Sequence, residues 1–370
     1  MKSKSNNNNA FVGMINVSNT CYINTFLQIM SVCKLDNLLE PRIDYIKEII
    51  KYEQANSDEI MVLELYNMLM IMKENKYARN PIKIKPYRFI KTMHAVATQK
   101  NNELFCTVGD QNDVGELLMF IFESVHNVLK MSVNTTHNKN INLEYTDVNE
   151  NDMSFIRVED VLEHSLQSPI IHNEGYTSTL LDEFGGIDVQ LVLNTAKSTC
   201  NLIFNPFYIL TLTIPDEAET IIDCLEHYKE CEEVELPGPN TRNKHKIMKV
   251  NAITKIPNIF IIMLNRSDYI NNCKITTVID GLCDQEIDFG KYMFPDIVNN
   301  QTNISTKYTL IATANHSGIH SNGGHYYAHL LDTKNNIWYN ANDNNISPIM
   351  NESNDSIFTD DTYMLFYEKI

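Results

Sequence analysis

The chain of 370 residues has few cysteines, no long apolar run and fewer basic than acidic side chains. Its eight cysteines are spread singly and without paired spacings, which argues against a disulfide framework. They are Cys21, Cys33, Cys106, Cys200, Cys224, Cys231, Cys273 and Cys283. No apolar run approaches the roughly 20 residues of a membrane span, and the first residues lack the apolar core of a secretory signal. We therefore expect an intracellular protein, cytoplasmic or nuclear, with reduced thiols.

The charge balance narrows the class of partner. The sequence has 30 Lys+Arg against 47 Asp+Glu, a formal net charge of −17. Such a surface repels phosphate groups, so we expect neither nucleic acid nor an anionic membrane as a partner. It attracts basic proteins or basic peptide tails, although acidity can also serve solubility alone.

Apolar periodicity divides the sequence into a helical first part and a β-rich second part, which indicates the α+β class. Residues 1–9 are asparagine-rich and are expected to be disordered. Helical spacing dominates from about 20 to 130 and is clearest in 112–130. Residues 133–178 are polar and acidic and look like an insertion or excursion, and β-rich runs follow Leu180. These runs are 189–193, 207–212, 259–264, 308–312, 325–331, 337–339 and 363–367.

One cysteine stands at the start of a predicted amphipathic helix. The apolar side chains after Cys21 have the spacing of one buried helix face, and they are Ile23, Phe26, Leu27 and Met30. Thr20 or Asn19 is expected to cap this helix. A helix N-terminus favours the thiolate through its dipole and free N–H groups, as a nucleophile requires. The alternative is that Cys21 is a small, inert core residue.

A nucleophilic cysteine needs a base, and histidines gather in one segment near the end of the chain. They are His316, His320, His325 and His329. Three glycines interrupt the segment, so the histidines cannot share a helix face as paired metal ligands do. No acidic or thiol ligand stands at a zinc-like spacing beside them. Metal binding is therefore the weaker interpretation.

The segment fits a glycine-rich loop that delivers one histidine at the start of a strand. His325 follows Gly323-Gly324, where backbone can approach a ligand closely. Asn342 or Asp343, in the turn after the next strand, would then lie near the ring and orient it. Taken alone, the pattern also fits a turn beside an ordinary histidine.

The segments around Cys21, His325 and Asn342 resemble, in that order, the ubiquitin-specific protease family of papain-like cysteine peptidases. The blocks between them also match, from Gln111-Asn112-Asp113-Val114-Gly115-Glu116-Leu117, similar to the family's Gln-Asp-x-x-Glu-Phe helix, to the closing Tyr363-Met364-Leu365-Phe366-Tyr367. The other matching blocks are 180–186, 206–212, 256–266 and 308–310. Ordered matches over about residues 11 to 370 favour Cys21 as the nucleophile.

The resemblance implies one catalytic domain over residues 10–370 with a papain-like thumb, palm and fingers architecture. The helical thumb would span about 10–135, with the acidic excursion of about 133–178 after it. The antiparallel fingers would span about 185–255 and the palm about 256–370. The implied reaction is hydrolysis of the isopeptide or peptide bond after the C-terminal Gly-Gly of ubiquitin, without a cofactor.

The resemblance also implies a role for each catalytic position. Cys21 would be the nucleophile, His325 the general base and Asn342 the third triad member. An amide orients an imidazole without adding negative charge, so Asp343 could supply part of the missing charge. Asn16, five residues before Cys21, matches the position whose side-chain amide helps form the oxyanion hole, with the cysteine N–H as second donor.

Substrate contacts follow from the same resemblance. Asp113 and Glu116 match acidic positions that line the channel for the ubiquitin tail, which carries two arginines. Without the surrounding motif, both would be taken for a solvated helix face. Gly323 and Gly324 would form part of a narrow slot that admits only glycines, and Tyr326 is expected to contact the substrate as well.

The sequence departs from the family at several positions. Ser18 replaces a glycine where a positive φ is expected, so strain is predicted there. Asn112 and Leu117 replace the usual Gln and Phe, and Ala341 replaces an aromatic before the triad turn.

Many members of the family carry two Cys-x-x-Cys knuckles that bind a structural zinc in the fingers. The first knuckle would fall near 194–197, which holds no cysteine, and only Cys224 and Cys231 occur between 224 and 250. With Cys200 this makes three dispersed thiols, so no structural zinc is expected.

Two alternatives to an active deubiquitinase stay open. One is a ubiquitin-binding pseudoenzyme, although the presence of Cys21, His325, Asn342 and Asn16 argues against it. The other is a protease for a different ubiquitin-like modifier.

Overall fold

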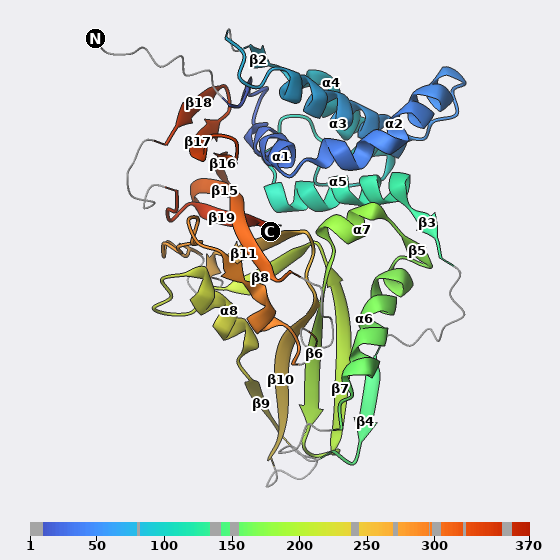
Figure 1. The fold of residues 1–370 in the computed structure, drawn as a ribbon, viewed down its shortest axis with the longest axis vertical. Helices are drawn as coiled ribbons and strands as arrows, with labels where there is room; N and C mark the ends of the chain where they lie inside the picture. Colours follow the sequence, from blue (N-terminus) through green and yellow to red (C-terminus); the bar gives the residue numbers. More distant parts are fainter. Residues whose placement is uncertain are drawn as a thin grey trace.

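Five helices form a layer over a large β-sheet in the computed structural model (Figure 1). The structure describes residues 10–79, 82–133, 142–148, 155–237, 244–268, 273–295, 297, 305–320, 323–349 and 357–370, so the predicted disorder of residues 1–9 lies outside it. The helices of the layer are α1 (Cys21–Val32), α2 (Leu35–Lys51), α3 (Ser57–Glu74), α4 (Tyr87–Gln99) and α5 (Val114–Leu129). The apolar stripes predicted for α1 and α5 are fully buried, which confirms both helices.

The sheet beneath these helices contains most of the C-terminal third of the chain. Its strands follow the order β18-β17-β16-β15-β19-β11-β8, with β14 paired to β15, and only β8 and β11 are parallel. They are β8 (Ile209–Thr213), β11 (Ile259–Asn265), β14 (Ile287–Asp288), β15 (Lys307–His320), β16 (Gly323–Asp332), β17 (Ile337–Asn342), β18 (Asn345–Pro348) and β19 (Thr362–Lys369). Helices and a mostly antiparallel sheet confirm the α+β class.

The central strands of the sheet, such as β11 and β19, are buried on both faces and separate two hydrophobic cores. In β11, Ile259 and Ile261 belong to the core under the helices, whereas Phe260, Ile262 and Leu264 belong to the second core. This alternation follows from the two-residue period of a strand. Because both faces are apolar, the run reads as continuously hydrophobic in the sequence.

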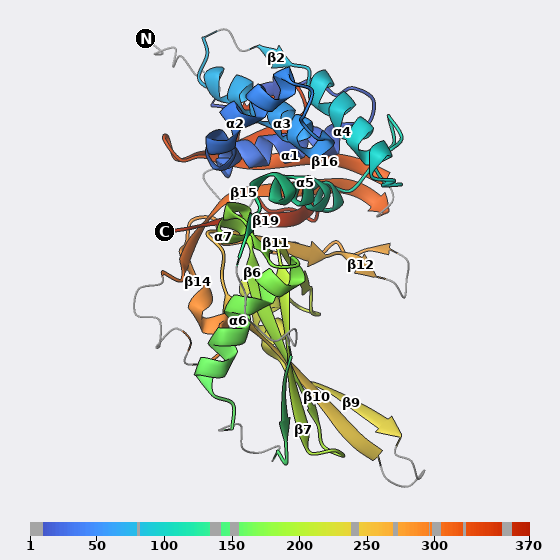
Figure 2. The ribbon, with the colours of Figure 1, turned by 90° about the vertical axis from the view of Figure 1, so that its right-hand side faces the viewer.

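A second, five-stranded antiparallel sheet extends away from the helical layer (Figures 1 and 2). Its order is β4-β7-β6-β10-β9, formed by β4 (Leu143–Thr146), β6 (Gly186–Asn194), β7 (Thr199–Phe207), β9 (Glu232–Pro237) and β10 (Lys244–Lys255). Helices α6 (Val158–His172) and α8 (Ile221–Lys229) pack beside it. The acidic stretch 133–178 thus supplies an edge strand and a helix whose Val161 is fully buried.

The run 207–212, predicted as one strand, is two strands in different sheets. Strand β7 ends at Phe207 and β8 begins at Ile209. The prediction was wrong because the chain bends at Tyr208 while the residues on both sides remain apolar. The bend passes the chain from the five-stranded to the eight-stranded sheet.

Short elements complete the described chain. They are β1 (Gly13–Met14) with β2 (Lys83–Ile84), β3 (Met131–Ser132) with β5 (Tyr176–Thr177), β12 (Ser267–Asp268) with β13 (Cys273–Lys274), helix α7 (Thr179–Phe184) and the 3-10 helix η1 (Phe289–Tyr292).

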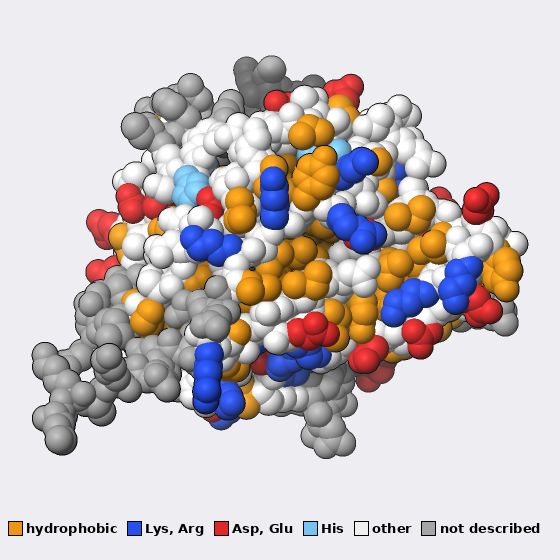
Figure 3. Space-filling model, turned by 90° about the horizontal axis from the view of Figure 1, so that it is seen from above, with side chains coloured by type: hydrophobic (Ala, Val, Ile, Leu, Met, Phe, Trp, Pro, Cys, Tyr) orange, Lys and Arg blue, Asp and Glu red, His pale blue; other side chains and the backbone are white. Residues whose placement is uncertain are grey.

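The outer surface of the helical layer carries hydrophobic side chains bordered by lysine and arginine (Figure 3). Helix α3 is apolar on both sides: Met61 and Leu65 are buried, whereas Ile60 and Ile71 are exposed. No helix within the described ranges is long and apolar enough to cross a membrane.

Candidate active site

Cys21 is the first residue of α1 and lies at the wall of a cavity, with 3% of its surface exposed. Thr20 occupies the N-cap position as predicted, but its hydroxyl makes no capping bond. Instead, the Thr20 hydroxyl accepts from Val17 N at 2.8 Å, and Thr20 N donates to Asn16 Oδ1 at 3.0 Å. The side chain of Asn16 therefore fixes the turn that leads into the nucleophile.

The turn before Cys21 uses left-handed backbone at two successive residues. Ser18 has φ 60° and Asn19 has φ 56°, which confirms the strain predicted at Ser18. Asn19 tolerates this region better and donates from Nδ2 to Gly109 O at 2.8 Å. The turn is thereby held against the loop that precedes α5.

His325 lies near the start of β16 and bonds to the third predicted triad residue. Its Nε2 is 2.7 Å from Oδ1 of Asn342, the last residue of β17. An amide oxygen only accepts, so Nε2 carries the hydrogen and Nδ1 is left for Cys21. The pKa of His325 is raised to about 9, first by its hydrogen bond to Cys21 and then by that to Asn342, while burial opposes the rise.

Asp343 joins the catalytic turn to helix α1. Its Oδ2 accepts from Asn16 Nδ2 at 2.9 Å and lies 4.0 Å from His325 Nε2. Its Oδ1 accepts from Asn24 Nδ2 at 2.8 Å, and its carbonyl accepts from Met14 N at 2.8 Å. One carboxylate thus contacts Asn16, His325 and helix α1, which begins at Cys21.

Asn24 is a site residue that the sequence prediction missed. It lies three residues after Cys21, is 2% exposed, and its Oδ1 has no hydrogen-bond partner in the described part of the chain. A buried amide within an apolar helix face was the available signal, because such groups normally serve a polar partner.

The cavity beside Cys21 has a volume of about 270 Å³. Among its lining residues are Cys21, Gln111, Glu116, His316, Gly323 and Gly324. Gln111, in the loop before α5, bonds to the backbone of Gly324 in β16. Its Nε2 donates to Gly324 O at 2.9 Å, and its Oε1 accepts from Gly324 N at 3.3 Å. The helical layer and β16 therefore meet across this cavity.

Asp113 and Tyr326, both predicted to contact substrate, bond to each other. Asp113 is the N-cap of α5: its Oδ1 accepts from Gly115 N at 2.7 Å and Glu116 N at 3.0 Å. Its Oδ2 accepts from the Tyr326 hydroxyl at 2.7 Å. Because both oxygens of Asp113 are occupied, exposed Glu116 is the more available carboxylate of this wall.

The two glycines before His325 differ in their surroundings. A Cβ on Gly324 would lie 2.4 Å from Ser317 O and 2.5 Å from His316 Nε2, whereas one on Gly323 would meet no atom closer than 3.5 Å. Packing within the protein therefore requires glycine at position 324.

His316, not assigned a role from the sequence, forms another part of this wall. Its ring lies 4.5 Å from the Tyr326 ring, and burial followed by the charge of Lys274 lowers its pKa. His329 is not among the residues that line the cavity. It is buried, and its Nδ1 is bonded to Ile357 O at 2.9 Å. The side chain of His320 lies outside the described residues.

Comparison with known proteins identifies the family of the chain. Residues 12–367 match the family model of ubiquitin carboxyl-terminal hydrolases. The chain belongs to this family. The resemblance noted from the sequence is thereby confirmed.

Individual ubiquitin carboxyl-terminal hydrolases are similar at low identity over nearly the whole chain. Usp2 of Drosophila melanogaster is 23% identical over 99% of this chain and 36% of its own length. Ubiquitin carboxyl-terminal hydrolase 2 of Homo sapiens is 24% identical over 96% of the chain and 54% of its own length. Ubiquitin carboxyl-terminal hydrolase 4 of Saccharomyces cerevisiae is 25% identical over 97% of the chain and 39% of its own length. The chain thus spans only a third to about half of these relatives.

The positions that depart from the family pattern are accommodated in this member. Asn112 donates from Nδ2 to the Tyr22 hydroxyl at 3.3 Å. Leu117 is fully buried, and Ala341 is 3% exposed and paired with Ala328 across β16 and β17.

The region where the family's zinc knuckles would fall holds buried or isolated thiols. Cys200 in β7 and Cys224 in α8 are buried, and burial raises the pKa of each thiol to about 11. Cys231 is exposed. No cluster of three or more metal-binding side chains occurs among the residues described. The absence of a structural zinc remains a prediction.

Proposed function

We propose that this chain is a deubiquitinating thiol protease that cleaves the isopeptide or peptide bond after the C-terminal Gly-Gly of ubiquitin. The observation that carries the proposal is the Cys21–His325–Asn342 contact chain at the wall of a cavity bounded by Gly323-Gly324. We further propose the thumb, fingers and palm division at the boundaries expected from the sequence, and an intracellular location in cytoplasm or nucleus, where ubiquitin conjugates occur.

The first step is attack of the Cys21 thiolate on the carbonyl carbon of the scissile bond. His325, protonated below about pH 9, provides the positive partner for this thiolate. It then gives its proton to the leaving amine, which departs and leaves a thioester on Cys21. In the second step a water molecule transfers a proton to neutral His325 and attacks the thioester, which regenerates the thiolate.

Two donors are available for the developing oxyanion. The Cys21 N–H is at the first helical position and has no intrahelical acceptor. The Asn16 amide has two hydrogens, of which one is bonded to Asp343, so the other is free for the oxyanion. The Asn16 amide is held through its oxygen by Thr20 N and through its nitrogen by Asp343. The donor is therefore fixed before the reaction, as electrostatic stabilisation of an oxyanion requires.

The lining of the cavity supports a preference for a tail of small residues. Gly323 and Gly324 form part of its wall, together with Gln111, which bonds to Gly324, and the ring of His316. Glu116, at the mouth, offers a carboxylate to the arginines of the ubiquitin tail.

Hydrolysis of ubiquitin carrying a C-terminal fluorogenic amide tests the proposal. We expect turnover by the unmodified chain, loss of turnover in Cys21→Ala, and retention in Cys231→Ala, which removes an exposed thiol beside β9. Tight binding of labelled ubiquitin without turnover would indicate the pseudoenzyme. Turnover of a ubiquitin-like modifier amide, but not of the ubiquitin amide, would indicate the other protease. Either result would contradict the proposal.

A further inference from the structure

Strand β15 extends beyond its neighbour β19 at the end nearest the site. The last pair between these strands is Asn315 with Thr362. Further on, β15 pairs only with β16 among the residues that the structure describes, with His316 opposite Tyr326 and Ser317 opposite His325. In the described part of the chain, no strand is therefore paired with the other edge of β15 beside His325, although β13 lies close to it.

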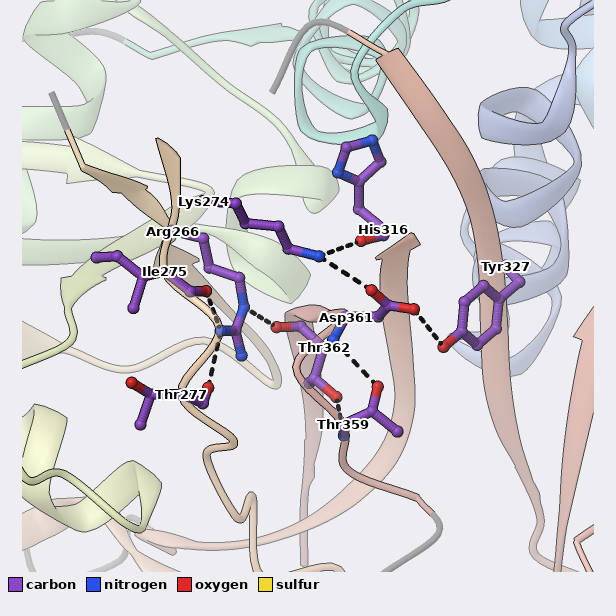
Figure 4. Close-up of polar contacts among 9 residues, drawn as sticks. All are labelled: Arg266, Lys274, Ile275, Thr277, His316, Tyr327, Thr359, Asp361 and Thr362. Atoms are coloured by element: carbon purple, nitrogen blue, oxygen red, sulfur yellow. Dashed lines mark hydrogen bonds and ion pairs between the residues drawn. The ribbon is translucent and has the colours of Figure 1, made fainter. Parts of the chain in front are cut away.

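Two groups supply the missing bonds on this edge (Figure 4). His316 N donates to Asp361 O at 2.7 Å, and the His316 carbonyl accepts from Lys274 Nζ at 2.6 Å. The same ammonium lies 3.0 Å from Asp361 Oδ1, and the Lys274 side chain is only 8% exposed. Asp361 Oδ2 accepts from the Tyr327 hydroxyl at 3.2 Å. The Lys274 ammonium thus donates the hydrogen bond that the N–H of a neighbouring strand would otherwise give to the His316 carbonyl.

The backbone around Lys274 is itself anchored. Arg266 Nη1 donates to Ile275 O at 2.9 Å and to Thr277 O at 2.8 Å, on the segment that follows Lys274. Arg266 Nε donates to Thr362 O at 2.5 Å, and the residue is 6% exposed. A buried guanidinium therefore ties this segment to the start of β19 and limits where the ammonium can go.

The other side of His316 faces the cavity. Figure 4 shows its ring directed away from Lys274 while its carbonyl accepts the bond. The ring packs on Tyr326 at 4.5 Å and leaves no room for a Cβ on Gly324. Displacing the His316 backbone would therefore move the wall beside Gly324.

We propose that Lys274 is a positioning residue for the substrate tail: it holds His316 so that the cavity keeps the width that suits a Gly-Gly end. The inference rests on the proposed function. Lys274 acts through the His316 carbonyl and does not touch the reacting atoms. Its loss should impair binding of the tail more than the reactivity of Cys21.

The test compares Lys274→Met with the unmodified chain on the ubiquitin C-terminal amide. Methionine keeps most of the volume but neither the charge nor the donors. We expect KM to rise about tenfold, as for loss of a charge-assisted bond, with kcat within about threefold. The rate at which iodoacetamide alkylates Cys21 in the folded protein, followed by mass spectrometry, should be unchanged because Lys274 bonds to the His316 carbonyl and not to Cys21 or His325.

Two further variants keep the result interpretable. Lys307→Met removes an exposed lysine paired with Glu286 at the far end of β15 and should leave KM unchanged. Asp361→Asn keeps the Lys274–His316 bond and should raise KM by only about threefold; it is the variant to read if Lys274→Met does not fold. An unchanged KM in folded Lys274→Met would overturn the inference, as would an unchanged KM in Asp361→Asn if Lys274→Met does not fold. A loss of Cys21 alkylation as large as the effect on KM would overturn it as well. An unmodified chain without turnover would refute the proposed function instead.

Discussion

At the scale of single residues, the site depends on a carboxylate that is not itself in the triad. Asp343 binds Asn16 through one oxygen and Asn24 through the other, and it lies 4.0 Å from His325. This geometry couples the oxyanion donor to the base. The negative charge adds to the effects of Cys21 and Asn342 in raising the pKa of His325 to about 9.

The pH dependence of turnover should report this raised pKa. A base whose pKa is raised is protonated below that value, so kcat/KM should fall as the pH rises through about 9. Asn342→Ala removes one of the groups that raise the pKa of His325. The alkaline fall of the pH profile should therefore move to lower pH in this variant. We also expect kcat/KM to fall by about tenfold to a hundredfold at its optimum. If kcat/KM of this variant falls at the same alkaline pH as that of the unmodified chain, the assignment of Asn342 is contradicted.

Ser18 offers a stability test at the same scale. Its φ of 60° costs energy for a residue with a Cβ, so Ser18→Gly should stabilise the fold by about 1 kcal/mol. Ser31→Gly, within helix α1, serves as the matched control and should destabilise by about 1 kcal/mol. Urea unfolding of both variants measures the difference, and a destabilised Ser18→Gly would refute the strain.

The sequence predicted the proposed catalytic residues but not the side chains that hold them in place. Cys21, His325 and Asn342 stand in recognisable local contexts, namely a helix start, a glycine turn and the turn after a strand. Asn24 and Gln111 act through partners 319 and 213 residues away. No local pattern encodes such a distant contact, so these roles required the structure.

At the scale of elements, the start of helix α5 carries both a helix cap and the carboxylates proposed to bind the substrate tail. Asp113 caps the helix and also holds Tyr326, whereas Glu116 in the first turn is exposed to the cavity mouth. The two carboxylates matched one family motif, yet their environments differ. Their contributions can therefore be separated by experiment.

Asp113→Asn should keep the helix cap, because asparagine caps as well as aspartate, but its amide nitrogen cannot accept from the Tyr326 hydroxyl. We expect a loss of at most about 1 kcal/mol in stability, with a raised KM. Glu116→Gln should raise KM with stability unchanged, because the side chain is exposed. Thermal unfolding together with KM for the ubiquitin amide distinguishes the two, and unchanged KM in both variants would contradict a role in tail binding.

Helices were predictable where the apolar residues kept one regular helical spacing along the sequence. Helices α1 and α5 each have one apolar face, and burial of that face agrees with the prediction. The prediction for the run 207–212 failed because the residues on both sides of the bend at Tyr208 are apolar, so no local signal marks where β7 ends and β8 begins. The sequence of the 133–178 excursion did not show that part of it forms a sheet edge and a packed helix, since its burial depends on the five-stranded sheet.

At the scale of the whole molecule, the eight-stranded sheet lies between the two cores and contacts both. It also brings the proposed catalytic residues together. Cys21 comes from the helical layer, and His325 and Asn342 come from the sheet below it. The five-stranded sheet extends from the opposite side (Figure 2). The site therefore depends on how the helical layer packs on the sheet, through the core that they share.

The most direct test of the central claim is reaction with ubiquitin that carries a C-terminal electrophile, followed by peptide mapping of the adduct. The account predicts one ubiquitin per chain, attached at Cys21, and no adduct in Cys21→Ala. Absence of an adduct from the unmodified chain, or an adduct that persists in Cys21→Ala, would contradict it.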